Sequence, residues 1–70
     1  MTQETTLEMV SRHVVEGEGH VAKQEQIVTD LDGKGHDTRL ARELLEVLNV
    51  SLAQHREHLE QLQPAPRPAT

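Results

Sequence analysis

The sequence contains no cysteine and no aromatic residue, and its three prolines all lie in the last seven residues. Without cysteine the chain cannot form a disulfide, use a thiolate as a nucleophile or bind a metal through sulfur. Without phenylalanine, tyrosine or tryptophan it has no ring on which a nucleic-acid base could stack. These absences exclude disulfide-stapled scaffolds, thiol enzymes and nucleic-acid binders of the base-stacking kind.

Basic clusters and long hydrophobic runs are missing as well. The formal net charge is −5, and the few lysines and arginines are scattered among acidic residues, so no basic patch is expected to hold nucleic acid or anionic lipid. No apolar run approaches the roughly 18 residues of a membrane-spanning helix, and no basic segment precedes an apolar one as in a signal peptide. We therefore expect no nucleic-acid partner, no membrane association and a cytoplasmic location.

What the sequence does contain is a modest set of aliphatic residues. There are nine leucines, seven valines, one isoleucine and two methionines, almost all of them between Leu7 and Leu62. A chain of 70 residues buries a smaller fraction of its surface than a larger domain does, so its core must be thin. Because small domains commonly gain stability by oligomerisation, the composition favours self-association over an isolated monomer.

The aliphatic residues follow a helical pattern. They recur at alternating spacings of three and four over residues 7–31 and again over residues 41–62. This spacing is typical of amphipathic helices that pack along a narrow seam, as in coiled coils. Since a short connection between two such helices makes them antiparallel neighbours, the pattern predicts an all-α fold, an antiparallel two-helix hairpin.

Local signals set the expected ends of the helices. The sequence from Thr5 to Glu8 matches a capping box, in which two residues at a helix start bond each other's backbone. Gly35 can take the left-handed conformation that ends a helix. Asp37 or Thr38 is then expected to cap the second helix.

These signals divide the chain into segments. The helical hairpin is expected over residues 5–63, with prolines after it that cannot continue a helix. The predicted segments are a flexible N-terminus 1–4, a helix over about 5–34, a turn over about 35–37, a helix over about 38–63, and a disordered Pro-rich tail 64–70.

Two glycines interrupt the first predicted helix. Folding the chain about residues 34–35 pairs positions whose numbers sum to about 69, which sets Gly17 opposite Leu52. Without a side chain, Gly17 lets this leucine sit close to the helix backbone. Gly19 falls on the outer face, where it is expected only to cost the helix about 1 kcal/mol relative to alanine.

Each predicted helix also carries a second stripe beside its seam, apolar near the turn and polar near the open end. A two-helix hairpin needs only one seam per helix, so this stripe would leave an exposed apolar patch unless another chain covers it. We expect a second copy to cover it, giving a homodimeric four-helix bundle, although a helix of another protein could take the same place. The predicted interface residues are Ile27, Leu31, Leu40, Leu44 and Val47.

The stretches EGEGHVAKQ, GHDTRLARELL and LAQH resemble a group of short bacterial proteins, similar to small hypothetical proteins common in rhizobia and related alphaproteobacteria. The resemblance covers residues 13 to about 62. It implies a bacterial origin and a helical hairpin, and it implies no reaction. Where the group has a large, often basic, residue between Glu18 and His20, this sequence has Gly19. The matching positions are His13, Glu16, Gly17, Glu18, His20, Gln24, Gly35, His36, Asp37, Thr38, Ala41, Leu44, Leu45 and His55.

Five histidines in 70 residues are many, and several lie on or beside the predicted seams. Neutral imidazole and carboxylate suit Zn²⁺ or another divalent metal, and helix faces can present them at these spacings. A zinc site built from histidine and glutamate is therefore one hypothesis, and no other cofactor is expected. The candidate ligands are His13, Glu16, His20, His55 and His58.

A structural role for the histidines is the interpretation we favour. His13, His20 and His55 would then be polar members of a small interface that hydrogen-bond to Gln24, Glu16 or a partner chain and fix its register. A response to pH is a third interpretation.

Catalysis has little support in the sequence. Ser11 and Ser51 lie on predicted helices without a nucleophile elbow, no glycine-rich loop is suited to phosphate, and a two-helix hairpin offers no deep pocket. We therefore expect no enzymatic activity. The expected function is that of a small interaction or regulatory module that acts through helix–helix association.

Overall fold

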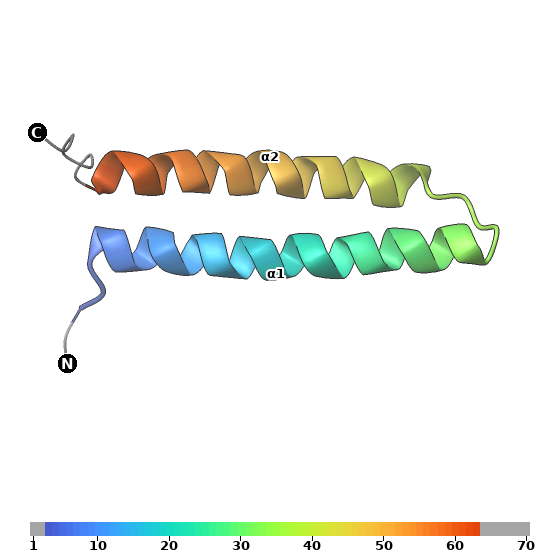
Figure 1. Ribbon diagram of the computed structural model, residues 1–70, viewed down its shortest axis with the longest axis horizontal. Helices are drawn as coiled ribbons and strands as arrows, with labels where there is room; N and C mark the ends of the chain where they lie inside the picture. Colours follow the sequence, from blue (N-terminus) through green and yellow to red (C-terminus); the bar gives the residue numbers. More distant parts are fainter. Residues whose placement is uncertain (1–2, 64–70) are drawn as a thin grey trace, which may run out of the picture.

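The computed structural model describes residues 3–63, and in this range the chain forms two helices that lie side by side (Figure 1). Helix α1 spans Thr6–Gly33, with 28 residues, and helix α2 spans Arg39–Leu62, with 24 residues. The chain reverses direction between them, so the two helices are antiparallel. The predicted all-α hairpin is confirmed. The predicted disordered tail 64–70 and the first two residues of the predicted flexible N-terminus lie outside the described residues.

The start of α1 is fixed by the predicted capping box. The backbone N–H of Glu8 donates to the hydroxyl oxygen of Thr5 at 3.0 Å, and the backbone N–H of Thr5 donates to the Glu8 carboxylate at 3.2 Å. These bonds satisfy two backbone donors at the helix start, Glu8 N–H and the N–H of Thr5 itself. Helix α1 therefore begins with its first turn already closed by side chains.

The connection begins with a Schellman motif around Gly35, whose φ of 73° lies in the left-handed region. The N–H of His36 donates to the carbonyl of Leu31 at 2.9 Å, and the N–H of Gly35 donates to the carbonyl of Asp32 at 3.1 Å. These two bonds satisfy carbonyls at the end of α1 and turn the chain back. The sequence-based expectation for Gly35 is confirmed.

The start of α2 is held more loosely. Thr38 occupies the N-cap position but its side chain makes no capping hydrogen bond. Instead the carboxylate of Asp37 accepts a hydrogen bond from the backbone N–H of Arg39 at 3.0 Å. Of the two predicted capping residues, Thr38 therefore occupies the N-cap position, whereas Asp37 accepts the hydrogen bond from the helix backbone.

The core is a narrow seam between the helices. Helix α1 contributes most of it, and α2 contributes one buried residue, Leu52, against which other leucines pack half-buried. The buried apolar residues of the described chain are Val10, Val14, Val21, Val28 and Leu52. The half-buried leucines packed on this seam are Leu45, Leu48 and Leu59.

One polar residue, Gln24, takes a place in this seam. Its side chain is buried, and its amide nitrogen donates to the backbone carbonyl of Ala41 in α2 at 2.9 Å. A buried amide without a partner would cost free energy, and this bond satisfies the donor while tying the two helices at one level. Gln24 therefore helps to fix the register of the hairpin.

The two helical glycines have different surroundings. A Cβ atom on Gly17 would lie 3.1 Å from the Cδ1 atom of Leu52, whereas a Cβ on Gly19 would meet nothing within 4 Å. The predicted pairing of Gly17 with Leu52 is confirmed, and it explains the close approach of the helices at this level. Nothing in the structure requires a glycine at position 19.

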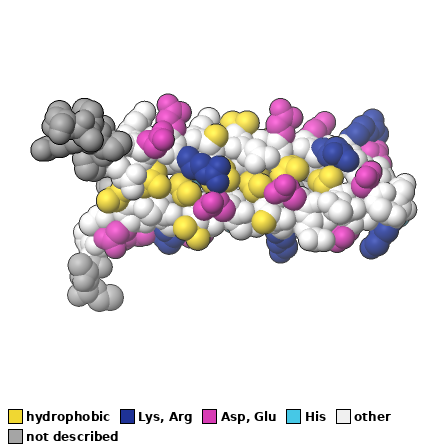
Figure 2. Space-filling view, in the orientation of Figure 1, with side chains coloured by type: hydrophobic (Ala, Val, Ile, Leu, Met, Phe, Trp, Pro, Cys, Tyr) yellow, Lys and Arg dark blue, Asp and Glu magenta, His cyan; other side chains and the backbone are white. Residues whose placement is uncertain are grey.

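The hairpin has two unlike faces. One is charged: Figure 2 shows acidic and basic side chains on both helices beside a line of apolar side chains between them, and no histidine is visible from this side. Two ion pairs join the helices, Glu18 with Arg56 at 3.2 Å and Asp32 with Arg42 at 3.9 Å. All four side chains are more than half exposed, so these pairs orient the helices more than they stabilise them. Neither of the described helices is apolar over a stretch long enough to cross a bilayer.

Candidate functional site on the second face of the hairpin

An apolar patch lies at the turn end of the second face. Leu40, Leu44 and Val47 follow one another at spacings of four and three along α2, so their side chains share one side of that helix. They are 80%, 49% and 63% exposed, and Ile27 of α1 is 38% exposed. The predicted interface residue Leu31 is half-buried in the last turn of α1. We use the name apolar patch for Ile27, Leu40, Leu44 and Val47.

The sequence pattern did not identify Val50 as part of this surface. Val50 is 52% exposed and lines a shallow groove along the outer side of α2, next to Val47 and Ser51. It lies outside the stripe in a plain helical projection, which is why it was missed. Its spacing of three residues from Val47 is the signal that extends the apolar surface toward it.

A groove lined by histidines lies nearer the open end of the hairpin. It has a volume of about 190 Å³ and runs between α1 and α2 above Gly17, whose missing side chain leaves it open. Drug-sized ligands commonly occupy pockets of roughly 300–1,000 Å³, so the groove suits an ion or a single side chain better than an organic substrate. The residues that line it are His13, Glu16, Gly17, His20, Leu48, Ser51, Leu52 and His55.

Four of the five candidate metal ligands therefore meet at one groove, and His58 is not among its lining residues. The rings of His13 and His55, one from each helix, lie with their centroids 5.2 Å apart and their planes tilted by 41°. Their proximity follows the pairing expected across the hairpin, in which position numbers sum to about 69. Within residues 3–63, no three or more histidine, aspartate or glutamate side chains converge closely enough to form a ready-made metal site.

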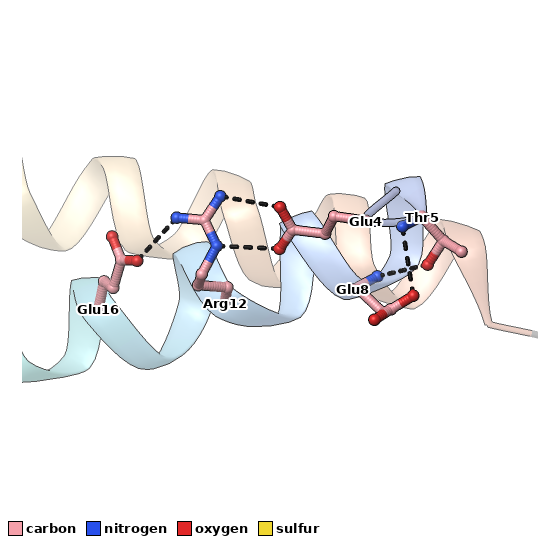
Figure 3. Close-up of polar contacts among 5 residues, drawn as sticks. All are labelled: Glu4, Thr5, Glu8, Arg12 and Glu16. Carbon is pink, nitrogen blue, oxygen red and sulfur yellow. Dashed lines mark hydrogen bonds and ion pairs between the residues drawn. The ribbon is translucent and has the colours of Figure 1, made fainter. Parts of the chain in front are cut away.

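A charged network stands beside the groove at the start of α1 (Figure 3). The Arg12 guanidinium donates two hydrogen bonds to the Glu4 carboxylate, at 2.9 and 3.1 Å, and a third to the Glu16 carboxylate at 2.9 Å. The hydrogen bonds from Arg12 lower the pKa of Glu4, and those carboxylates in turn raise the pKa of Arg12. Arg12 therefore holds Glu16 on the wall of the groove and ties the segment before α1 to the helix.

The fold and this face together define a class, a two-helix hairpin with two unlike faces. One face is charged. The other carries an apolar patch near the turn and a histidine groove nearer the open end. Comparison with protein-family models, with curated proteins and with solved structures finds no match to this chain.

Proposed function

We propose that the protein is a non-enzymatic interaction module that pairs with a second copy of itself through the second face, so that two hairpins form a four-helix bundle. The observation that carries the proposal is the apolar patch, in which Leu40 and Val47 expose more than half of their side-chain surface. Clustered aliphatic side chains of this kind commonly mark a surface that another chain covers.

The uneven burial of the two helices supports this proposal. In α2, Leu45, Leu48 and Leu59 pack only half-buried on the seam, and Leu52 is the one residue that is buried. Leu48 lines the groove on the second face, so covering that face with further helices would remove more of its surface from water, at roughly 25 cal/mol for each Å². A second pair of helices would therefore bury more apolar surface than the narrow seam alone and would stabilise the hairpin.

The distribution of residues along the face supports a second copy as the occupant. Since the patch lies at the turn end and the polar groove nearer the open end, a two-fold axis that places turn over turn sets apolar side chains against apolar ones. The same arrangement sets the polar halves against each other. Such an interface is isologous, because each copy contributes the same residues, and the resulting bundle follows the packing of antiparallel four-helix proteins.

Within this proposal, regulation acts through exchange of helices. A helix of another protein with apolar residues at matching spacings would compete for the patch and replace one hairpin. The module would work in the cytoplasm, where the partner helix is presented.

The oligomeric state tests the proposal. Sedimentation equilibrium at micromolar concentration is expected to report a dimer. Leu44→Asp should give a monomer, because the new carboxylate would otherwise be buried in an apolar interface. The matched control is Val15→Asp, which makes the same kind of change at a 68% exposed residue of α1 outside the patch and should stay dimeric. A well-folded wild-type monomer at these concentrations would rule out self-association.

A further inference from the structure

The histidine groove lies outside the apolar patch that carries the proposed dimer, and the geometry of its histidines points to a separate site. We infer that His13 and His55 chelate a divalent transition-metal ion of the class that prefers imidazole, with Zn²⁺ as its representative. The ion would join the first half of α1 to the second half of α2. This inference does not rest on the proposed function, since both ligands belong to one hairpin.

The spacing of the two rings carries the inference. In a tetrahedral zinc site with Zn–N bonds of about 2.0–2.1 Å, two imidazole centroids lie about 5 Å apart. The centroids of His13 and His55 are 5.2 Å apart. Their planes are tilted by 41°, as rings on two different ligand directions are, and are not stacked in parallel. The two helices thus hold the imidazoles at the centroid spacing that a shared ion requires.

The surroundings of the pair favour an ion. Both residues are half-buried and line the groove above Gly17, so an ion can reach them from solvent. The groove is small, and its floor includes the apolar side chains of Leu48 and Leu52. A site with two protein nitrogens keeps its remaining coordination positions for water.

The other candidate ligands are placed less well. His20 lines the same groove but is exposed, whereas His13 and His55 are half-buried and form the close pair of rings. The carboxylate of Glu16 lines the groove but accepts a hydrogen bond from Arg12 at 2.9 Å. His58 lies outside the lining of the groove. The structure thus reduces five candidates to one pair.

Thermal melts of the full chain with ZnCl₂ and with a chelator test the site. Zinc is expected to raise the melting temperature of the wild type, because an ion that binds only the folded state stabilises it. His13→Ala and His55→Ala should each lose this rise, whereas His58→Ala and His36→Ala should keep it. The rise should also persist in Leu44→Asp, so that loss of the dimer and loss of the metal site are told apart.

Direct observation of the histidine rings removes any dependence on how well the variants fold. In the wild type, NMR of the imidazole protons is expected to show that substoichiometric Zn²⁺ shifts the resonances of His13 and His55 and leaves those of His36 and His58 in place. Absence of binding would overturn the inference, and so would shifts centred on His36 or His58. A zinc response that disappears in Leu44→Asp would equally overturn a site within one hairpin.

Discussion

The two helices of the hairpin are similar in length but differ in how completely they are buried. Helix α1 has five buried residues, four of them valines, whereas α2 has one, Leu52. The buried seam of α1 is built mostly of valines, whereas the leucines that α2 packs on it, apart from Leu52, stay partly exposed. Contact with α2 thus buries most of the apolar seam of α1, whereas contact with α1 leaves most of the apolar side chains of α2 at least partly exposed.

The start of α1 is also held by more hydrogen bonds between side chain and backbone than the start of α2. Helix α1 opens with a closed capping box and with Arg12 bound to the preceding Glu4, whereas Thr38 at the start of α2 makes no capping bond with its side chain. Helix α1 is thus fixed by local contacts as well as by packing. Helix α2 depends more on packing, and its exposed apolar side chains are part of the surface that we propose the second copy covers.

The largest expected effect comes from Leu52. Leu52→Ala truncates the one buried side chain of α2 and leaves a cavity against Gly17, so we expect a loss of about 2–5 kcal/mol in the free energy of unfolding. Val21→Ala on α1 should cost less, since fewer methyl groups are removed from the seam. Urea denaturation of the two variants at one protein concentration measures both losses. Equal losses would contradict the contrast between the helices.

A smaller effect is expected at the helix starts. Thr5→Ala removes the hydroxyl that accepts from the Glu8 N–H, and loss of such a cap costs about 1 kcal/mol. Thr38→Ala should cost less, because the Thr38 side chain makes no capping bond. The difference in urea midpoint between the two alanine variants sharpens the comparison of α1 with α2. A larger loss at Thr38 would reverse it.

The smallest effect concerns acid. Hydrogen bonds from Arg12 hold the pKa of Glu4 below the usual 4.5, and Arg39 likewise holds the pKa of Asp37 below the usual 3.8. A carboxyl with a lowered folded pKa stabilises the fold above its unfolded pKa, and this contribution is lost as the pH falls through the folded value. Melting temperatures should therefore decrease slightly as the pH drops below about 4.5.

Substituting Arg12 and Arg39 one at a time distinguishes the acid sensitivity at the start of α1 from that at the start of α2. Arg12 contacts a residue eight positions away, so its pair with Glu4 depends on the folded segment, whereas Asp37 and Arg39 are two residues apart and can meet without the fold. Arg12→Leu is expected to flatten the decrease in acid, and Arg39→Leu to change it less. The opposite order in pH-dependent melts would contradict this assignment.

Much of the fold could be predicted from the sequence because it follows from periodic and local signals. The spacing of aliphatic residues gave the two helices, and the positive φ of Gly35 was expected from its place after the first helical pattern. The observed helices, Thr6–Gly33 and Arg39–Leu62, begin and end one residue inside the predicted bounds. The pairing of Gly17 with Leu52 followed from counting outward from the turn.

The contacts that escaped prediction are those that helical spacing does not describe. Glu4, Glu8 and Arg12 have the spacing of neighbours on one helix surface, but Glu4 lies before the helix and reaches Arg12 from outside it, while Glu8 turns back to Thr5. The ion pairs that join the helices depend on the exact rotation of each helix, which a sequence pattern does not fix.

The sequence predicted which residues could belong to the candidate site, but not which of them lie close together. The sequence placed His13, His20 and His55 along the seams, and the structure brings all three to one groove. Only distances could show that His13 and His55 form the close pair and that His58 lies outside the groove. The assembly, the bacterial origin suggested by resemblance and the metal remain predictions.

The Schellman turn also has a consequence for the order in which the hairpin folds. Residues on either side of a short link meet at little cost in chain entropy, so we expect contacts between α1 and α2 to form first beside Gly35 and then to extend toward the two termini. The histidine pair lies in the part that closes last. Interactions absent from the transition state act on the unfolding rate, so an ion bound by His13 and His55 would slow the opening of the hairpin and leave the speed of its formation almost unchanged.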